Sequence, residues 1–564
     1  MMTALLLPTV FAVTAVSAEA KETPASKKRA AADSKFTIPL AVEWKFTGVS
    51  FANNDATPIV TEDTVYFASG SRVYAVDTVS GSLKWKYPSD NFLQRLTTTT
   101  PVYADGTLFV GTGEGLYALD AKTGKLKYPG FIVPNGVAVS PVVIGDSVYF
   151  GAGSGRVYGL NTKTGEPITP AYAKGLDFGA DLAGDFSVDN GLLYVVTTDQ
   201  VLRVLDPTTG SQRWAHRMDA DVRKVVPVAA GENLYVAAGS SLSNFRLNNG
   251  EPRWTLPLPS NASAPVAVDA DDNAFVITSE RYLYAIDSRG RSVWKIAPRV
   301  DYEVSARPII AGDVLIVGTR GGGIYGYDRL TGELKWNYAV RPSSIDPFNV
   351  PIAVRVSSRP VSFGNGLFVL TDDGTLTAFR NDAADNTPPS VTRLDPEQGE
   401  YVGNQLPFRI GAKVLDDGSG LNVATMVFKI DATDVPRRRE TDVLASAKAS
   451  YTFDKDTGLL EYTIIESESG KSNTLADGHH TATLIAEDWF GNKVTKAWTF
   501  TVDSALRGMK RKSQQRTGGR PGVGGPGVGG GGGLTGGSGR RGGGAGGGDK
   551  GGADKGGAGG GSGE

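Results

Sequence analysis

The side chains that most often carry catalytic or metal-binding chemistry are scarce in this sequence of 564 residues. It contains no cysteine, which excludes disulfides, thiolate metal sites and a cysteine nucleophile. Its three histidines are His216, His479 and His480. His479 and His480 are neighbours in a predicted strand, where successive side chains point to opposite faces, so they are poorly placed to share a metal ion. Histidine-based catalysis therefore has few candidates.

Two acidic groups could supply the oxygen ligands that calcium prefers. One is Asp269-Ala-Asp-Asp-Asn273, and the other consists of Asp177, Asp181 and Asp185 in a glycine-rich stretch. Asp and Asn also start turns, because their side chains bond nearby backbone groups, and we expect turns or loops at both places. The sequence has no Gly-x-Ser-x-Gly elbow, phosphate-binding loop or His-Glu-x-x-His motif. We therefore predict no catalytic residues and no metal site.

The elements that would position functional groups come from a repeat of about forty residues. In five units, an apolar segment leads to an Asp, then to a turn glycine, and then to an aromatic residue, as in Val73-Tyr-Ala-Val-Asp-Thr-Val-Ser-Gly-Ser-Leu-Lys-Trp85, and weaker copies end near Thr169 and at Trp254. The turn glycines are spaced by 43, 41, 45, 40, 40 and 42 residues. The repeated positions are the glycines Gly81, Gly124, Gly165, Gly210, Gly250, Gly290 and Gly332, the aspartates Asp77, Asp120, Asp206, Asp287 and Asp328, and the tryptophans Trp44, Trp85, Trp214, Trp254, Trp294 and Trp336.

This spacing predicts an all-β propeller over residues 40–382. Each unit has room for four strands, which is one blade, and the tryptophan at a fixed offset can pack between adjacent blades. Seven units have a turn glycine and an outer strand, whereas residues 359–379 have only the first three strands. The segment 41–46 would supply the missing strand. We predict eight blades, the last closed by the N-terminal strand, with seven blades as the alternative.

The repeat resembles the pyrroloquinoline-quinone (PQQ) repeat family, which includes quinoprotein alcohol dehydrogenases and the propeller subunit of the bacterial outer-membrane assembly machine. For an enzyme, the resemblance implies a quinone on the propeller axis, calcium held by Glu and Asn, an Asp base and often a cysteine pair. This chain has no cysteine, and its short units leave little room for a walled cofactor site. The one long gap between equivalent unit positions runs over 52 residues from Pro308 to Pro360, and it holds residues 341–352, a candidate loop over one mouth of the ring. No cofactor is expected, and PQQ with calcium is the alternative.

A second module follows residues 386–390, where Asn-Thr-Pro-Pro-Ser forms a semi-rigid linker. Residues 388–503 are strand-like, and they contain Asp416-Asp-Gly-Ser-Gly-Leu421, an Asp-Gly-His strand start, an Ala-x-Asp-x-x-Gly-Asn turn and a Trp-x-Phe-x-Val strand. This pattern resembles bacterial immunoglobulin-like surface modules. We therefore predict an immunoglobulin-like β-sandwich without a disulfide.

The two ends of the sequence have different compositions. Residues 1–20 read as a secretory signal peptide without a basic start, and 21–39 as a linker. Residues 504–564 begin with basic residues and become glycine-rich, which predicts a disordered tail with weak attraction to polyanions. The formal net charge of −2 gives no case for nucleic-acid binding.

These observations favour an exported, non-catalytic scaffold over an enzyme. The predicted partners are envelope or extracellular proteins, and the predicted location is periplasmic, cell-surface or secreted. The alternatives are a PQQ- and calcium-dependent dehydrogenase and a sensor of glycans or small ligands.

Overall fold

The structure is a computed structural model that describes residues 36–48, 56–89, 99–222, 225–341, 354–438, 450–464 and 475–506. The predicted signal peptide, most of the predicted linker before the propeller, the candidate mouth loop beyond Arg341 and the glycine-rich tail lie outside these residues. Strands make up almost all of the regular structure, and one short helix, α2 (Pro170–Lys174), interrupts them. No helix of the described part is long and apolar enough to cross a membrane.

Residues 41–380 form eight antiparallel sheets in the described chain, of which six have four strands and two have three. The strands, sheet by sheet and in their hydrogen-bonded order, are β2 (Ile59–Val60), β3 (Thr64–Ser69), β4 (Arg72–Asp77) and β5 (Leu83–Tyr87); β6 (Val102–Ala104), β7 (Thr107–Gly111), β8 (Gly115–Asp120) and β9 (Phe131–Ile132); β10 (Val137–Ile144), β11 (Ser147–Ala152) and β12 (Val157–Asn161); β13 (Ser187–Asp189), β14 (Leu192–Thr197), β15 (Val201–Leu205) and β16 (Gln212–Arg217); β17 (Val228–Ala230), β18 (Asn233–Ala238), β19 (Ser241–Arg246) and β20 (Pro252–Pro257); β21 (Ala267–Val268), β22 (Ala274–Ile277) and β23 (Leu283–Ile286); β24 (Ile309–Ala311), β25 (Val314–Gly318), β26 (Gly323–Asp328) and β27 (Leu334–Ala339); β28 (Val361–Phe363), β29 (Gly366–Leu370), β30 (Thr375–Arg380) and β1 (Ala41–Thr47).

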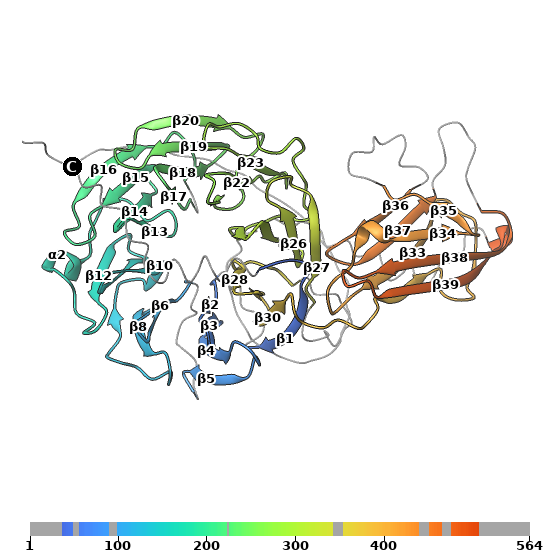
Figure 1. The fold of residues 1–564 in the computed structure, drawn as a ribbon, viewed down its shortest axis with the longest axis horizontal. Helices are drawn as coiled ribbons and strands as arrows, with labels where there is room; N and C mark the ends of the chain where they lie inside the picture. Colours follow the sequence, from blue (N-terminus) through green and yellow to red (C-terminus); the bar gives the residue numbers. More distant parts are fainter. Residues whose placement is uncertain are drawn as a thin grey trace, which may run out of the picture. The chain divides into compact units, whose positions relative to one another are not determined.

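The sheets follow one another around a common centre, as the ribbon shows (Figure 1). The first strands of neighbouring sheets contact one another from β6 through β10, β13, β17, β21 and β24 to β28, and β28 also contacts β2. The outermost place beside β30 is taken by β1, with Lys45 opposite Thr377 and Phe46 opposite Leu376. This is the pairing that the sequence predicted for the N-terminal strand. It gives the outer edge of β30 a hydrogen-bonded neighbour.

Two sheets lack the predicted fourth strand, which corrects the expectation of four strands in every unit. After β12, the place of the outer strand is taken by two isolated bridges, of Leu160 with Pro167 and of Val157 with Leu176, and by α2, which Thr169 caps. Proline cannot donate a backbone hydrogen bond to a sheet, and Pro167 and Pro170 stand in this segment. After β23, only the isolated bridges of Ile286 with Ser292 and of Tyr282 with Arg299 form.

The interior of each sheet is apolar because its middle strands are covered on both faces. All residues of β3, β7, β25 and β29 are buried. Their side chains form clusters between neighbouring sheets, such as the one in which Phe275 and Ile277 meet Val317. The fold is therefore held together by sheet-to-sheet packing around the ring. Each sheet buries apolar side chains on both of its faces, against the sheet before it and the sheet after it.

The C-terminal part consists of two further sheets that share one hydrophobic core. Its members include Phe428, Leu460 and Trp498, which are buried. Residues 1–509 are one compact unit, so the C-terminal sheets belong with the propeller sheets. The strands are β31 (Ser390–Asp395), β33 (Phe408–Leu415), β37 (Leu459–Ile464) and β36 (Tyr451–Asp454) in one sheet, and β32 (Tyr401–Val402), β39 (Lys493–Val502), β38 (Gly478–Glu487), β34 (Val427–Ile430) and β35 (Thr433–Val435) in the other, with the 3-10 turns η1 (Val423–Thr425) and η3 (Ser504–Leu506).

Candidate functional site at the junction of the modules

The carboxylates of the repeated aspartates accept hydrogen bonds from backbone N–H groups of their own turns. Asp77 accepts hydrogen bonds from the backbone N–H groups of Val79 and Ser80, at 3.1 and 2.9 Å. The bond from Ser80 is the largest influence that lowers the pKa of Asp77, to about 2. Gly81 follows with φ of +68°, a conformation that favours glycine. The same backbone-to-carboxylate bonds are made at Asp120, Asp206, Asp287 and Asp328.

The repeated tryptophans lie on the turn glycines of the following unit. A Cβ atom at Gly81 would stand 2.6 Å from the Trp44 ring, so no other residue fits beneath the indole. The Trp44 indole also donates a hydrogen bond of 3.2 Å to the backbone oxygen of Thr78. Trp85, Trp214, Trp254 and Trp294 lie in the same way on Gly124, Gly250, Gly290 and Gly332, whereas Tyr128 lies on Gly165 and Leu176 beside Gly210.

Trp336 is the last tryptophan of the series, and its partner comes from the C-terminal module. Its indole donates a hydrogen bond of 2.9 Å to the backbone oxygen of Ser419, and the ring is fully buried. Ser419 belongs to the loop 416–420, which follows β33. The backbone N–H of Val42 in β1 bonds to Gly418 of the same loop at 3.0 Å. Loop 416–420 therefore stands where the turn of another repeat unit would stand.

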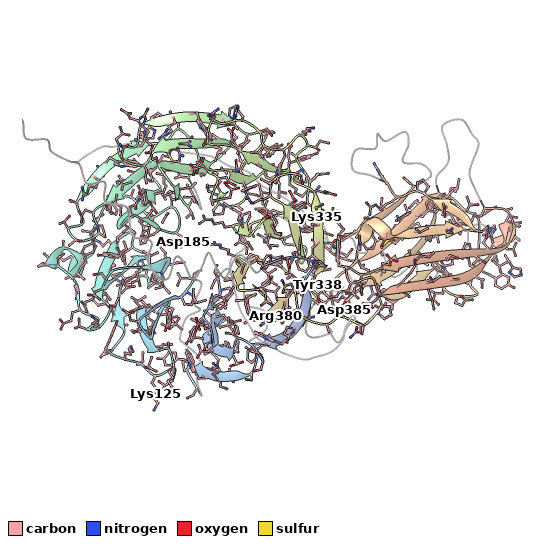
Figure 2. The ribbon with its side chains drawn as sticks, viewed as in Figure 1. Lys125, Asp185, Lys335, Tyr338, Arg380 and Asp385 are labelled. Atoms are coloured by element: carbon pink, nitrogen blue, oxygen red, sulfur yellow. The ribbon has the colours of Figure 1, made fainter. Side chains whose placement is uncertain are left out.

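The burial of β27 shows how far this contact extends. Trp336, Asn337 and Tyr338 are buried in β27, whereas the equivalent strands β5, β16 and β20 alternate between exposed and half-buried residues. Tyr338, labelled in Figure 2, donates to the backbone oxygen of Asp417 at 3.1 Å. The indole of Trp489 donates to the backbone oxygen of Asn337 at 3.2 Å.

A second contact inserts a carboxylate from the C-terminal module into the propeller. Asp456 lies in the hairpin between β36 and β37 and is 5% exposed. It accepts hydrogen bonds from the hydroxyls of Thr319, at 2.6 Å, and Tyr325. Burial raises the pKa of Asp456 to about 6. Next to it, the Lys455 ammonium stands 3.2 Å from the Asp301 carboxylate.

Three carboxylates meet beside the loop 416–420. Asp385 follows β30, Asp416 follows β33 and Asp488 follows β38, and one oxygen of each lies within 4.8 Å of the others. Burial raises the pKa of Asp416 to about 6, and the neighbouring Asp385 and Asp488 act in the same direction. Asp416 was part of a motif noted in the sequence, but the pattern did not indicate that these three residues converge. Figure 2 labels Asp385.

Near the centre of the ring, side chains link consecutive sheets. The backbone N–H of Thr57 bonds to the Thr100 hydroxyl, that of Thr100 to the Ser140 hydroxyl, and that of Ser140 to the Asp185 carboxylate, at 3.0, 3.1 and 2.9 Å. Asp185 is labelled in Figure 2 on the inner side of the sheets. Arg307 also precedes a first strand, and burial lowers its pKa to about 9.

The other acidic candidates have protein partners. Asp269 accepts from the N–H groups of Asp271 and Asn273, and the Arg329 guanidinium lies 2.9 Å from Asp269 and 2.7 Å from Asp271. The expected turn is therefore present, with an arginine beside it. Asp177 pairs with Arg156 at 2.6 Å. It lines an open depression of about 450 Å³ together with Ser154, Gly179, Ala180, Asp181, Thr198 and Asp199.

The histidines are separate from one another. The His216 ring packs against Phe245 with 4.8 Å between ring centroids. His480 is buried and contacts Asp431 at 2.6 Å, and His479 contacts the Thr501 hydroxyl at 2.9 Å. No two histidines share a partner in the described residues.

The chain is similar to proteins of outer-membrane assembly. The family model described as outer membrane protein assembly factor BamB matches residues 44–171, 169–266 and 239–387. Two curated proteins with this name are 30% identical over 133 residues (Burkholderia pseudomallei; 23% of this chain, 32% of the relative) and 26% identical over 228 residues (Shewanella oneidensis; 38% and 56%). The matches thus span about a third to about half of these relatives. The crystal structure of BamB from Moraxella catarrhalis has 18% identity and a TM-score of 0.48, over 60% of this chain and 99% of that one.

Proposed function

Starting from the fact that this chain belongs to the repeat family of the outer membrane protein assembly factor BamB, we propose that it is a non-catalytic binding scaffold of the bacterial cell envelope. The eight sheets of residues 41–380 are taken as eight blades, closed by β1. The two C-terminal sheets are taken as an immunoglobulin-like sandwich. Residues 1–20 are taken as an export signal, consistent with the envelope proteins that the chain resembles.

The observation that carries the proposal is the docking of the loop 416–420 on β1 and β27. Here the outer surface of the propeller holds a loop of another module through backbone hydrogen bonds and a buried indole. The contact is made by the repeat tryptophan Trp336, by Tyr338 of the same strand and by the backbone of β1. A scaffold that binds one protein segment in this way has the chemistry to bind others.

The remaining polar side chains of the repeat also support a structural role. The turn aspartates bond their own backbone, the indoles bond the next unit, and the hydroxyls of Thr100 and Ser140 link neighbouring sheets. These bonds hold the sheets in place relative to one another. They place no requirement on the sequences of the other hairpins at the two ends of the strands. Binding residues gather on such loops.

The quinone-enzyme alternative has poorer support from the residues. PQQ carries three carboxylates, and the open depression beside α2 is lined by the carboxylates of Asp177, Asp181 and Asp199. Asp177 and Asp199 there are already paired with Arg156 and Arg203, and Asp181 would repel an anionic cofactor, so this lining does not favour PQQ. Calorimetric titration of the chain with PQQ and calcium tests the alternative, and one site of micromolar affinity would overturn the scaffold proposal.

Photo-crosslinking from single positions tests the scaffold proposal. Because antiparallel strands alternate in direction, the first and second hairpins of a sheet lie on opposite faces of the ring. Asp105 and Asn190 are exposed on first hairpins, and Thr198 and Glu280 on second hairpins. A photo-reactive residue at each of these positions, in intact envelopes, should give discrete crosslinks to the same envelope proteins from one face and few from the other. Equal, diffuse labelling from all four positions would contradict a specific binding face.

A further inference from the structure

We propose that Asp385, Asp416 and Asp488 form a binding site for one calcium ion. The three residues come from separate segments, namely the linker after β30, the loop after β33 and the turn after β38. They are 8%, 5% and 1% exposed, and a ligand oxygen of each lies within 4.8 Å of the other two. Three oxygens at such separations surround a space of the size that one cation bridges.

Salt bridges in the described part of the chain supply no counter-charge to this group. Asp385, Asp416 and Asp488 form no salt bridge with a lysine, arginine or histidine among the residues that the structure describes. Neutral donors contact all three: the N–H groups of Gly418 and Gly420 reach Asp416, and that of Ser419 reaches Asp385. Asp385 also accepts from Thr387, and Asp488 accepts from the backbone and side-chain amides of Asn492. These dipoles orient the oxygens but do not neutralise three buried negative charges, which are costly without a cation.

A buried hydroxyl gives an independent indication of a ligand. Ser419 is fully buried, and its Oγ has no hydrogen-bond partner in the described part of the chain. The backbone N–H of the same residue donates to the Asp385 carboxylate at 2.8 Å, which places Ser419 beside the three carboxylates. Buried hydroxyls are normally satisfied, so an oxygen left open beside three carboxylates indicates a missing partner that accepts oxygen lone pairs.

The composition of the site favours calcium. All available ligand atoms are oxygens, which excludes the nitrogen and sulfur preference of zinc and copper. The ligands stand on three segments of irregular backbone, and calcium tolerates such flexible geometry, whereas magnesium requires a near-ideal octahedron and retains several waters. A bound calcium would connect the linker, the loop that covers Trp336 and the turn that carries Trp489. It would thereby fasten the C-terminal module to the propeller.

Calorimetry and terbium luminescence on the full chain test the site. After removal of metals with EDTA, titration with calcium chloride should show one site per chain of micromolar or tighter affinity. Terbium should bind in the same place, and its emission should be sensitised by excitation of tryptophan because Trp489 adjoins Asp488. Calcium should displace terbium and raise the midpoint of thermal unfolding.

Matched variants locate the binding. Asp385→Asn and Asp488→Asn should weaken calcium binding at least about tenfold, since even residues that only support a ligand cost 10- to 100-fold. Ser419→Ala, which removes no charge, should weaken it less. Asp417→Asn is the control, because Asp417 is adjacent in sequence but exposed and paired with Arg341. It should bind calcium like the unmodified chain.

Three results would overturn the proposal. They are the absence of calcium binding by the unmodified chain at millimolar concentration, equal losses in Asp417→Asn and Asp385→Asn, and equal or tighter binding of magnesium. If the carboxylate variants fail to fold, the unmodified chain and Ser419→Ala still decide between the outcomes. The scaffold proposal does not depend on calcium and is tested separately by the crosslinks.

Discussion

The indole nitrogen of Trp336 lies 2.9 Å from the backbone oxygen of Ser419, 83 residues further along the chain. In the preceding units the same indole position bonds to the next repeat, as Trp294 does to Arg329 at 2.9 Å. The C-terminal module thus uses its loop 416–420 to complete a contact that the repeat would otherwise leave open. The two modules are coupled by the same interaction that couples one repeat unit to the next.

The Trp336–Ser419 contact should be a main determinant of stability. Trp336→Ala removes a fully buried ring, and we expect the free energy of unfolding to fall by about 3–5 kcal/mol. Denaturant unfolding followed by circular dichroism measures this change. Trp214→Ala is the control, because Trp214 occupies the same repeat position but is only partly buried. Equal losses in the two variants would contradict the special role of Trp336.

The glycine beneath an indole should tolerate no side chain. In Gly81→Ala the new Cβ would stand 2.6 Å from the Trp44 ring and would also adopt a positive φ. We expect a loss of about 1–2 kcal/mol for the backbone conformation and about 1–3 kcal/mol for the overpacking. Gly106→Ala isolates the first effect, since Gly106 has φ of +71° and nothing within 4 Å of its Cβ position. Thermal or denaturant unfolding that shows the same loss for both variants would refute the packing explanation.

The buried carboxyl of Asp456 should make the stability depend on pH. Its pKa is about 6 in the folded chain, above the value of about 3.9 in unfolded chains. The folded protein therefore holds this proton more tightly, and the resulting stabilisation is complete below about pH 4 and is lost as the pH rises through 6. We expect a contribution of about 2–3 kcal/mol between these limits.

Asp456→Asn removes this titration while retaining a neutral polar side chain. The free energy of unfolding of the unmodified chain should fall relative to that of Asp456→Asn between pH 4 and pH 7. All other titrating groups are common to both proteins and cancel in the difference. Parallel pH profiles would show that Asp456 does not carry a raised pKa.

The absence of native cysteine allows a direct test of ring closure by β1. The Thr47 and Thr375 hydroxyls are 3.4 Å apart across the β1–β30 pair. The double variant Thr47→Cys/Thr375→Cys should form an intramolecular disulfide under mild oxidation, because the two residues face each other in the strand pair and their γ atoms already lie close together. Mass spectrometry of the unreduced peptides detects it, and each single variant serves as control. Failure to form the bond in a folded protein would contradict the pairing.

The sequence by itself determined the repeat, its period and the positions of the aspartates, glycines and tryptophans. These positions were predictable because each unit forms the same hairpin turn from local interactions. In the first unit, Asp77 starts the turn, Gly81 ends it with a positive φ, and the next strand pairs with the preceding one. The pairing of β1 with β30 was also predictable, since residues 359–379 lacked one strand and an unpaired edge requires a neighbour. The loss of the outer strand after β12 was less evident, although Pro167 and Pro170 gave a local signal.

Only the tertiary structure decided what covers Trp336 and where Asp385, Asp416 and Asp488 meet. These contacts join residues from 34 to 107 positions apart, and no period relates the C-terminal module to the propeller. Asp416 and Ser419 read locally as an ordinary glycine-rich turn, and Asp456 as a hairpin residue. Their burial against β27 and Tyr325 depends on how two sets of sheets pack on each other, and that is set by the shape and polarity of both surfaces together.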